Sequence, residues 1–103
     1  MADSIRIRAQ AKDGTALVNV LMPHPMKSGL RKDESGALVA AHYITDVEIR
    51  VGDRTVLLAR LSRAVSKDPL LQFRIKGAVP GARITVTWVD DRGVRRSDAA
   101  LIT

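Results

Sequence analysis

Two histidines and a methionine are the residues of this 103-residue sequence best suited to bind a metal. His24, Met26 and His42 share one irregular stretch, residues 22–43. Imidazole nitrogens and a thioether sulfur together suit copper. A blue-copper centre also needs a cysteine thiolate, and the sequence contains no cysteine. A looser copper-binding redox domain is therefore one hypothesis, weighed against the commoner role of such residues in packing.

Serine–lysine neighbours and an aspartate pair are the other candidates for chemistry. Lys27-Ser28 and Ser66-Lys67 could activate a hydroxyl only if the amine reached it, but adjacent side chains of an extended chain point in opposite directions. Asp90-Asp91 could act as an acid–base pair, yet its place before Arg92-Gly93 favours turn formation. We therefore predict no catalytic residue, no bound metal, no cofactor and no enzyme activity.

Strands with a two-residue period must position these side chains. Apolar and polar residues alternate along the chain over residues 5–12, 15–22, 47–51, 71–76 and 83–88. Turn signals separate the strands at Asp13-Gly14, Gly52-Asp53, Pro80-Gly81 and Asp91-Arg92-Gly93. Helical periodicity is absent from the pattern. The sequence thus predicts an all-β protein, an immunoglobulin-like antiparallel β-sandwich of about seven strands, forming a single domain over residues 1–103.

One strand departs from the alternation. Between Thr55 and Leu61, apolar residues occupy both faces, with Val56 and Leu58 on one and Leu57, Ala59 and Leu61 on the other. A strand of this kind needs cover on two sides. Two explanations stay open: a central strand beneath a long loop, or a surface that a partner protein covers.

Charge limits the choice of partner. Seventeen basic residues against eleven acidic ones give a formal net charge of +6, which favours anionic partners. The basic residues are scattered, and no aromatic platform or recognition helix accompanies them, so we predict no nucleic-acid partner. No run approaches the ~18 apolar residues of a membrane span. The first residues, 1–4, lack a secretory pattern, so the chain read alone would be cytosolic.

Three segments together resemble a known family. They are His24 to Asp33 (HPMKSGLRKD), Ala64 to Pro69 (AVSKDP) and Trp88 to Gly93 (WVDDRG). Their order and spacing are similar to those of SoxZ, the Z subunit of the thiosulfate-oxidising sulfur carrier complex SoxYZ. The first segment is unusual enough to be fairly specific.

The resemblance implies a non-catalytic subunit that forms a heterodimer with the Y subunit, SoxY. In that family, SoxY carries sulfur intermediates on a cysteine in a mobile C-terminal arm, and the complex docks transiently with other Sox enzymes. The resemblance also implies a periplasmic protein without its own signal peptide, exported with the signal-bearing partner. A scaffold without thiols would not compete for the sulfur cargo by exchange.

From the resemblance and the irregular stretch we predict a partner-binding surface. Its residues are His24, Pro25, Met26, Lys27, Gly29, Arg31, Leu57, Leu61, Ser66 and Asp68. A positive φ at Gly29 would let the loop turn sharply enough to present this surface.

Overall fold

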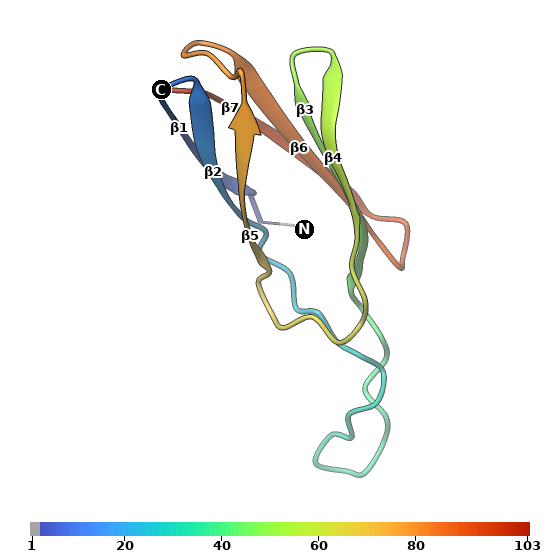
Figure 1. Ribbon diagram of the computed structural model, residues 1–103. Helices are drawn as coiled ribbons and strands as arrows, with labels where there is room; N and C mark the ends of the chain where they lie inside the picture. The colour runs from blue at the N-terminus through green and yellow to red at the C-terminus, as the bar shows by residue number, and fades with distance from the viewer. Residues whose placement is uncertain (1–2) are drawn as a thin grey trace.

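Two antiparallel sheets make up the computed structural model, which describes residues 3–103 (Figure 1). The strands are β1 (Arg6–Lys12), β2 (Thr15–Leu21), β3 (Ile44–Val51), β4 (Arg54–Arg60), β5 (Leu70–Lys76), β6 (Arg83–Asp90) and β7 (Arg95–Leu101). One sheet has the order β1-β2-β5, and the other has the order β4-β3-β6-β7. The predicted immunoglobulin-like sandwich of seven strands is confirmed, and residues 3–103 contain no helix that could span a membrane.

The core lies between the sheets and follows from the alternation in sequence. Val18 and Val20 of β2 face Ile49 of β3 and Val86 of β6 from the opposite layer, and all four are fully buried. Trp88 is the largest buried side chain and is 1% exposed. It packs into this aliphatic cluster. Asp13 and Gly14 both have positive φ, which is the conformation their hairpin turn requires.

Among residues 3–103, backbone hydrogen bonds between the two sheets close one margin of the sandwich. There, the N–H of Ala11 donates to the carbonyl of Thr103 at 2.9 Å, and the N–H of Thr103 donates to the carbonyl of Ala9 at 3.0 Å. The opposite margin is formed by β4 and β5, which each pair with one strand and are edges of different sheets. We call this side the open margin, because no backbone hydrogen bond joins β4 to β5 among residues 3–103; Figure 1 shows the two strands in separate sheets.

The strand with two apolar faces is one of those edges. Leu57 and Ala59 face inward from β4 and are half-buried, whereas Leu58 faces outward and is 73% exposed. The register between β3 and β4 shifts after Ile49, so Val56 is the extra residue of a bulge. The alternative of a central strand beneath a loop is therefore wrong, because no segment of residues 3–103 covers Leu58.

Residues 27–42, which we call the arm, leave the sandwich as a narrow, two-branched projection (Figure 1). Its branches pair at Lys27 with His42 and again at Lys32 with Leu38. Backbone hydrogen bonds join them, including one from the N–H of Val39 to the carbonyl of Arg31 at 2.8 Å. The arm lies outside the core, and its residues 30–38 are all exposed.

Candidate functional site

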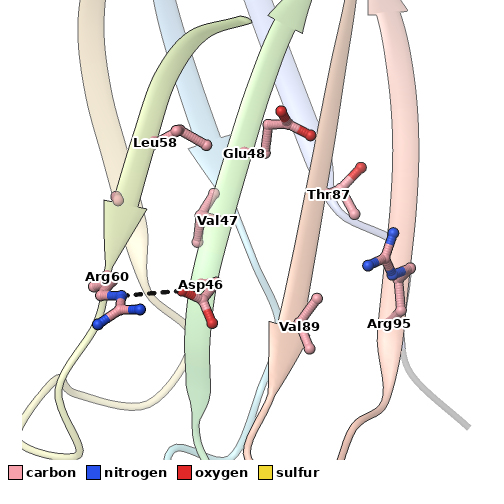
Figure 2. A pocket seen from close by; sticks show the side chains of 9 residues that line it. Asp46, Val47, Glu48, Leu58, Arg60, Thr87, Val89 and Arg95 are labelled. Carbon is pink, nitrogen blue, oxygen red and sulfur yellow. Dashed lines mark ion pairs between the residues drawn. The ribbon is translucent and has the colours of Figure 1, made fainter.

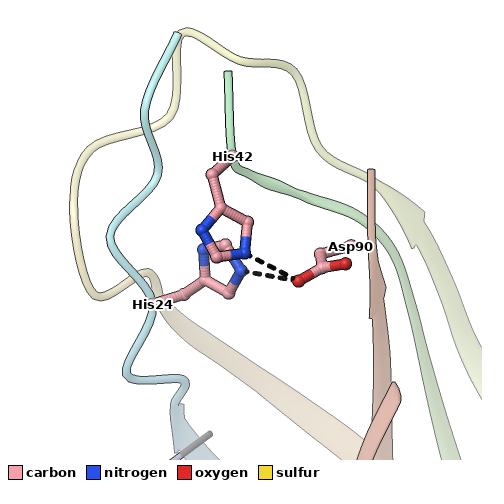
Figure 3. A group of neighbouring side chains, drawn as sticks. All are labelled: His24, His42 and Asp90. Atoms are coloured by element: carbon pink, nitrogen blue, oxygen red, sulfur yellow. Dashed lines mark hydrogen bonds and ion pairs between the residues drawn. The ribbon is translucent and has the colours of Figure 1, made fainter. Parts of the chain in front are cut away.

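A buried cluster of His24, His42 and Asp90 lies where the arm joins the sandwich (Figure 3). His24 follows β2, His42 precedes β3, and Asp90 ends β6, so three separate segments meet at one carboxylate. The Nε2 atoms of His24 and His42 lie 3.2 Å and 3.0 Å from the Oδ2 atom of Asp90. His24 and Asp90 are buried, and His42 is half-buried.

The carboxylate of Asp90 is fully used by hydrogen bonds. Its Oδ2 atom faces the two imidazoles, and its Oδ1 atom accepts from the backbone N–H groups of Arg92 at 3.0 Å and Val94 at 2.9 Å. These two bonds shape the turn after β6, so the turn role predicted for this aspartate is confirmed. The same side chain thus holds a hairpin turn and the base of the arm together.

The backbone fixes the tautomer of His24. The N–H of Met26 donates to Nδ1 of His24 at 3.2 Å, so Nδ1 must be unprotonated. The proton of the neutral ring then sits on Nε2, where it is donated to Asp90. Met26 reaches this position with φ of 49°, a left-handed conformation that costs energy for a residue other than glycine. The backbone of Met26 is therefore strained at the base of the arm, where its N–H contacts His24.

Aromatic packing and a second loop hold His24 in place. The ring of His24 meets Trp88 edge to face, with centroids 5.1 Å apart. Its backbone N–H donates to the Oδ1 atom of Asp68 at 3.0 Å, and the N–H of Asp68 donates back to the carbonyl of His24. The loop 61–69 is thereby tied to the segment that leads into the arm.

Burial and hydrogen bonding shift the acidities of the cluster. Burial is the main reason that the pKa of His24 is lowered, and it outweighs the hydrogen bond to Asp90, which acts in the opposite direction. Burial alone would raise the pKa of Asp90. The hydrogen bonds from His24, Val94, His42 and Arg92 outweigh that effect and hold this pKa below its usual value. At neutral pH the cluster therefore combines a neutral His24 with an ionised Asp90.

This arrangement predicts a loss of stability on mild acidification. The unfolded chain protonates His24 near pH 6.5, whereas the folded chain does so only at lower pH, so the unfolded state binds more protons in between. The free energy of unfolding should fall as the pH drops from about 7 to 5, by at most about 1.4 kcal/mol per pH unit for this one group. Urea denaturation across that range measures it.

A His24→Gln variant is the control for that titration, because glutamine can accept from Met26 and donate to Asp90 without titrating. Its unfolding free energy should depend less steeply on pH than that of the wild type. An equal slope in both proteins would mean that other groups cause the acid sensitivity.

The donor set differs from that of the alternative hypothesis, a copper site of His24, Met26 and His42. The structure brings His24 and His42 together, but the sulfur of Met26 accepts a hydrogen bond from the N–H of Ile44 at 3.2 Å. The third member is Asp90, and the three possible ligand atoms lie within 4.8 Å of one another. Two imidazoles and a carboxylate suit a harder ion than copper(I). If Nε2 of His24 bound a metal, the proton of the neutral ring would have to move to Nδ1, where the N–H of Met26 already donates. Hydrogen bonding is therefore the better account of the cluster.

Two hollows lie near these elements. One, of about 500 Å³, borders the cluster and is lined by Pro23, Pro25, Lys67 and Asp68 as well as by His42. The other, of about 460 Å³, lies on the outer face of the four-stranded sheet (Figure 2). Its side chains are of mixed charge, and Asp46 pairs with Arg60 there at 3.5 Å. Neither hollow presents an arrangement of nucleophile, base and oxyanion donors.

The predicted partner-binding residues fall into three groups. His24 and Met26 are buried and belong to the base of the arm, while Pro25, Lys27 and Arg31 are exposed on or beside it. Ser66 and Asp68 lie on the neighbouring loop and are exposed. Leu57 and Leu61 are half-buried near the open margin. Gly29 has φ of 82°, as expected, and faces the other branch of the arm.

Sequence reasoning missed Asp90 as the residue that joins the two histidines. A signal was present: Ile84, Val86, Trp88 and Asp90 continue one inward-facing alternation. A carboxylate at an inward position needs buried donors, and two histidines are natural candidates.

The fold and site define a class: a small antiparallel sandwich with a projecting arm, whose base is fixed by a buried hydrogen-bonded cluster. The chain belongs to the SoxZ family, since the family model described as sulphur oxidation protein SoxZ matches residues 5–100. This membership gives it a role in sulphur oxidation. No match was found among curated proteins.

Solved structures show the same fold at low identity. The chain is similar to a superoxide reductase crystallised in the oxidised state, with 12% identity and a TM-score of 0.69 over 99% of this chain and 89% of that one. It is also similar to the hypothetical protein PH1083 from Pyrococcus horikoshii, with 13% identity and a TM-score of 0.70 over the same shares. At such identities the likeness extends to the fold alone.

Proposed function

We propose that this chain is the non-catalytic Z-type subunit of a periplasmic sulfur carrier complex and pairs with a cysteine-bearing Y-type subunit. The match to the SoxZ family over residues 5–100 carries the proposal. The 103 residues contain no cysteine, so they offer no thiol for covalent sulfur carriage. The partner would carry the cargo, and this chain would give it a rigid body from which to present that cargo to other Sox enzymes.

The uncovered apolar surface supports a permanent partner. Leu58 on the edge strand β4 is 73% exposed, and Leu30 and Leu38 on the arm are 70% and 66% exposed. Exposed leucines beside unpaired strand edges are typical of surfaces that a second chain covers. We infer that the arm and the open margin both contact the Y-type subunit, because an arm that projects from one end can extend along a neighbour that packs against the margin.

Size-exclusion chromatography with light scattering tests this function. The chain alone should self-associate, and addition of the Y-type subunit should give a stable one-to-one complex. A monodisperse monomer that ignores the Y-type subunit would contradict the proposal. In the one-to-one complex, the cargo on the Y-type subunit would be tethered to this chain, which would raise its effective concentration at each enzyme that docks.

Gly29 offers a sharper test of the arm. A Cβ atom placed on Gly29 would lie 3.0 Å from the Cβ atom of Ala41 on the opposite branch, and φ is already unfavourable for a β-branched residue. Gly29→Val should therefore distort the arm and weaken binding of the Y-type subunit by about tenfold or more, equivalent to about 1.4 kcal/mol. The melting temperature should change little, because the arm lies outside the core.

Gly36→Val is the matched control. Gly36 has φ of 87°, but nothing lies within 4 Å of its added Cβ atom. This variant carries the same backbone strain without the contact to the second branch, so it should weaken the complex less. Normal assembly of the Gly29→Val variant with the Y-type subunit would show that the arm is not part of the interface.

A further inference from the structure

The outer face of the three-stranded sheet carries charge of one sign. Four rows of residues cross β1, β2 and β5 in register on this face. They are Arg6–Leu21–Leu70, Arg8–Asn19–Gln72, Gln10–Leu17–Arg74 and Lys12–Thr15–Lys76. We call these twelve residues the basic face. It holds five cations and no carboxylate, since β1, β2 and β5 contain no acidic residue.

The cations of the basic face are free to meet a partner. All five are exposed, and none makes an ion pair with another group among residues 3–103. Asp13, in the turn after β1, is the acidic residue next in sequence to this face. Side chains two residues apart on a strand lie about 7 Å apart, and β1 lies about 10 Å from β5. The five charges therefore form a compact array.

The other sheet differs. Its outer face places Asp46 and Glu48 of β3 among arginines, and Asp46 pairs with Arg60 (Figure 2). Internal pairing leaves less uncompensated charge for an outside ligand there. The outer face of the three-stranded sheet therefore carries more uncompensated positive charge than that of the four-stranded sheet.

Apolar and polar groups accompany the charges of the basic face. Leu17 and Leu70 are 47% and 56% exposed between the cations. A hollow of about 420 Å³ runs from Arg6 and Arg8 across to Leu70, with Asn19 in its lining. The Oδ1 atom of Asn19 is buried and has no hydrogen-bond partner among residues 3–103. A buried acceptor without a donor is unfavourable, so rotation of the Asn19 amide toward a partner's donor would relieve that cost.

These features favour a protein over other anions. Single-stranded nucleic acid needs aromatic side chains on which bases stack, and the basic face has none. Exposed leucines and a neutral amide, by contrast, match the mixture of apolar and polar contacts in protein interfaces. Carboxylates are the anionic groups of protein surfaces.

We propose that the basic face is a docking surface for an acidic protein surface, separate from the arm and open margin. The inference rests on the proposed function, since the partners it concerns are the enzymes that a sulfur carrier complex visits. Complementary charge would speed their encounter and orient them, while Leu17 and Leu70 would add the short-range contact. Because it is mainly electrostatic, the docking would be transient and sensitive to salt.

The test uses the complex with the Y-type subunit and two triple variants. One carries Arg8→Glu, Arg74→Glu and Lys76→Glu on the basic face. The other carries Arg54→Glu, Arg83→Glu and Arg95→Glu on the four-stranded sheet, where all three side chains are also exposed. Both change the net charge equally. Surface plasmon resonance then measures binding of each complex to the other Sox enzymes of the same sulfur-oxidising system at about 50 and 200 mM salt.

The basic-face variant should bind at least one enzyme about tenfold more weakly, mainly through a slower association rate, and its affinity should depend less on salt. The control variant should lose less than about threefold. A Leu17→Ser/Leu70→Ser variant should weaken binding at the higher salt as well, because its effect is not screened.

Other outcomes overturn the inference. Equal losses in both triple variants would show an effect of net charge alone. No loss in either variant would show that the basic face takes no part in docking. Failure of the basic-face variant to pair with the Y-type subunit would make this face the subunit interface. Tighter binding to single-stranded RNA or to phosphatidylglycerol vesicles than to any enzyme would show that the ligand of the basic face is not a protein. If the wild-type chain itself does not pair with the Y-type subunit, the proposed function fails, and enzyme binding by the chain alone still tests the face.

Discussion

Trp88→Ala should lower the free energy of unfolding by about 3–5 kcal/mol, the usual cost of removing a large buried ring. The side chain is 1% exposed and fills the space between the sheets, so its loss leaves a cavity in an aliphatic cluster. It also removes the edge-to-face contact with His24. For a domain of this size the melting temperature should fall by about 12 °C or more, as measured by circular dichroism.

Trp88→Phe separates packing from hydrogen bonding. The indole Nε1 atom is buried without a hydrogen-bond partner among residues 3–103, so phenylalanine keeps an aromatic ring and removes an unsatisfied donor. This variant should cost less than half as much as the alanine variant. A loss of under about 1.5 kcal/mol for Trp88→Ala would show that the sheets close over the space.

Asp90→Asn should cost about 2–3 kcal/mol, because it removes charge-assisted bonds and buries an amide donor against imidazole donors. His42 can change its tautomer to accept from the new amide. His24 is prevented from doing so by the N–H of Met26. Urea denaturation measures the loss of stability. Amide hydrogen exchange should also show faster exchange for arm residues such as Lys27 and His42, whose backbone bonds lie beside the cluster.

Asp91→Asn is the control for this substitution. Asp91 accepts one bond from the N–H of Tyr43 at 3.0 Å and is exposed, so an amide oxygen can replace the carboxylate. Its effect should stay within about 0.5 kcal/mol. Equal costs for the two variants would show that the cluster contributes no special stability.

The strands could be read from the sequence because each carries its own pattern. The alternation from Ile84 to Trp88 predicts which residues face inward, and Asp13-Gly14 predicts a turn. Neither prediction needs information from elsewhere in the chain. Family membership was also visible in three short segments. These features are local, and the structure agrees with them.

Long-range arrangement could not be read in the same way. The sequence could not place β4 at an edge, because the order of strands depends on pairing between distant segments. It also gave no register for the arm, whose branches are joined by a few backbone hydrogen bonds and whose residues 30–38 are all exposed. The cluster needed three segments to meet, and Asp90 lies 66 positions from His24 in the chain.

The difference between the two margins bears on how much reorganisation energy a partner must supply. The sheets are linked at the margin where Thr103 bonds to Ala9 and Ala11. At the other margin, a strand or side chain that enters between β4 and β5 meets half-buried residues such as Leu57 and Phe73 and breaks no pairing within either sheet. Association there would need repacking of side chains only, so little of the binding energy would be spent on deforming the free subunit.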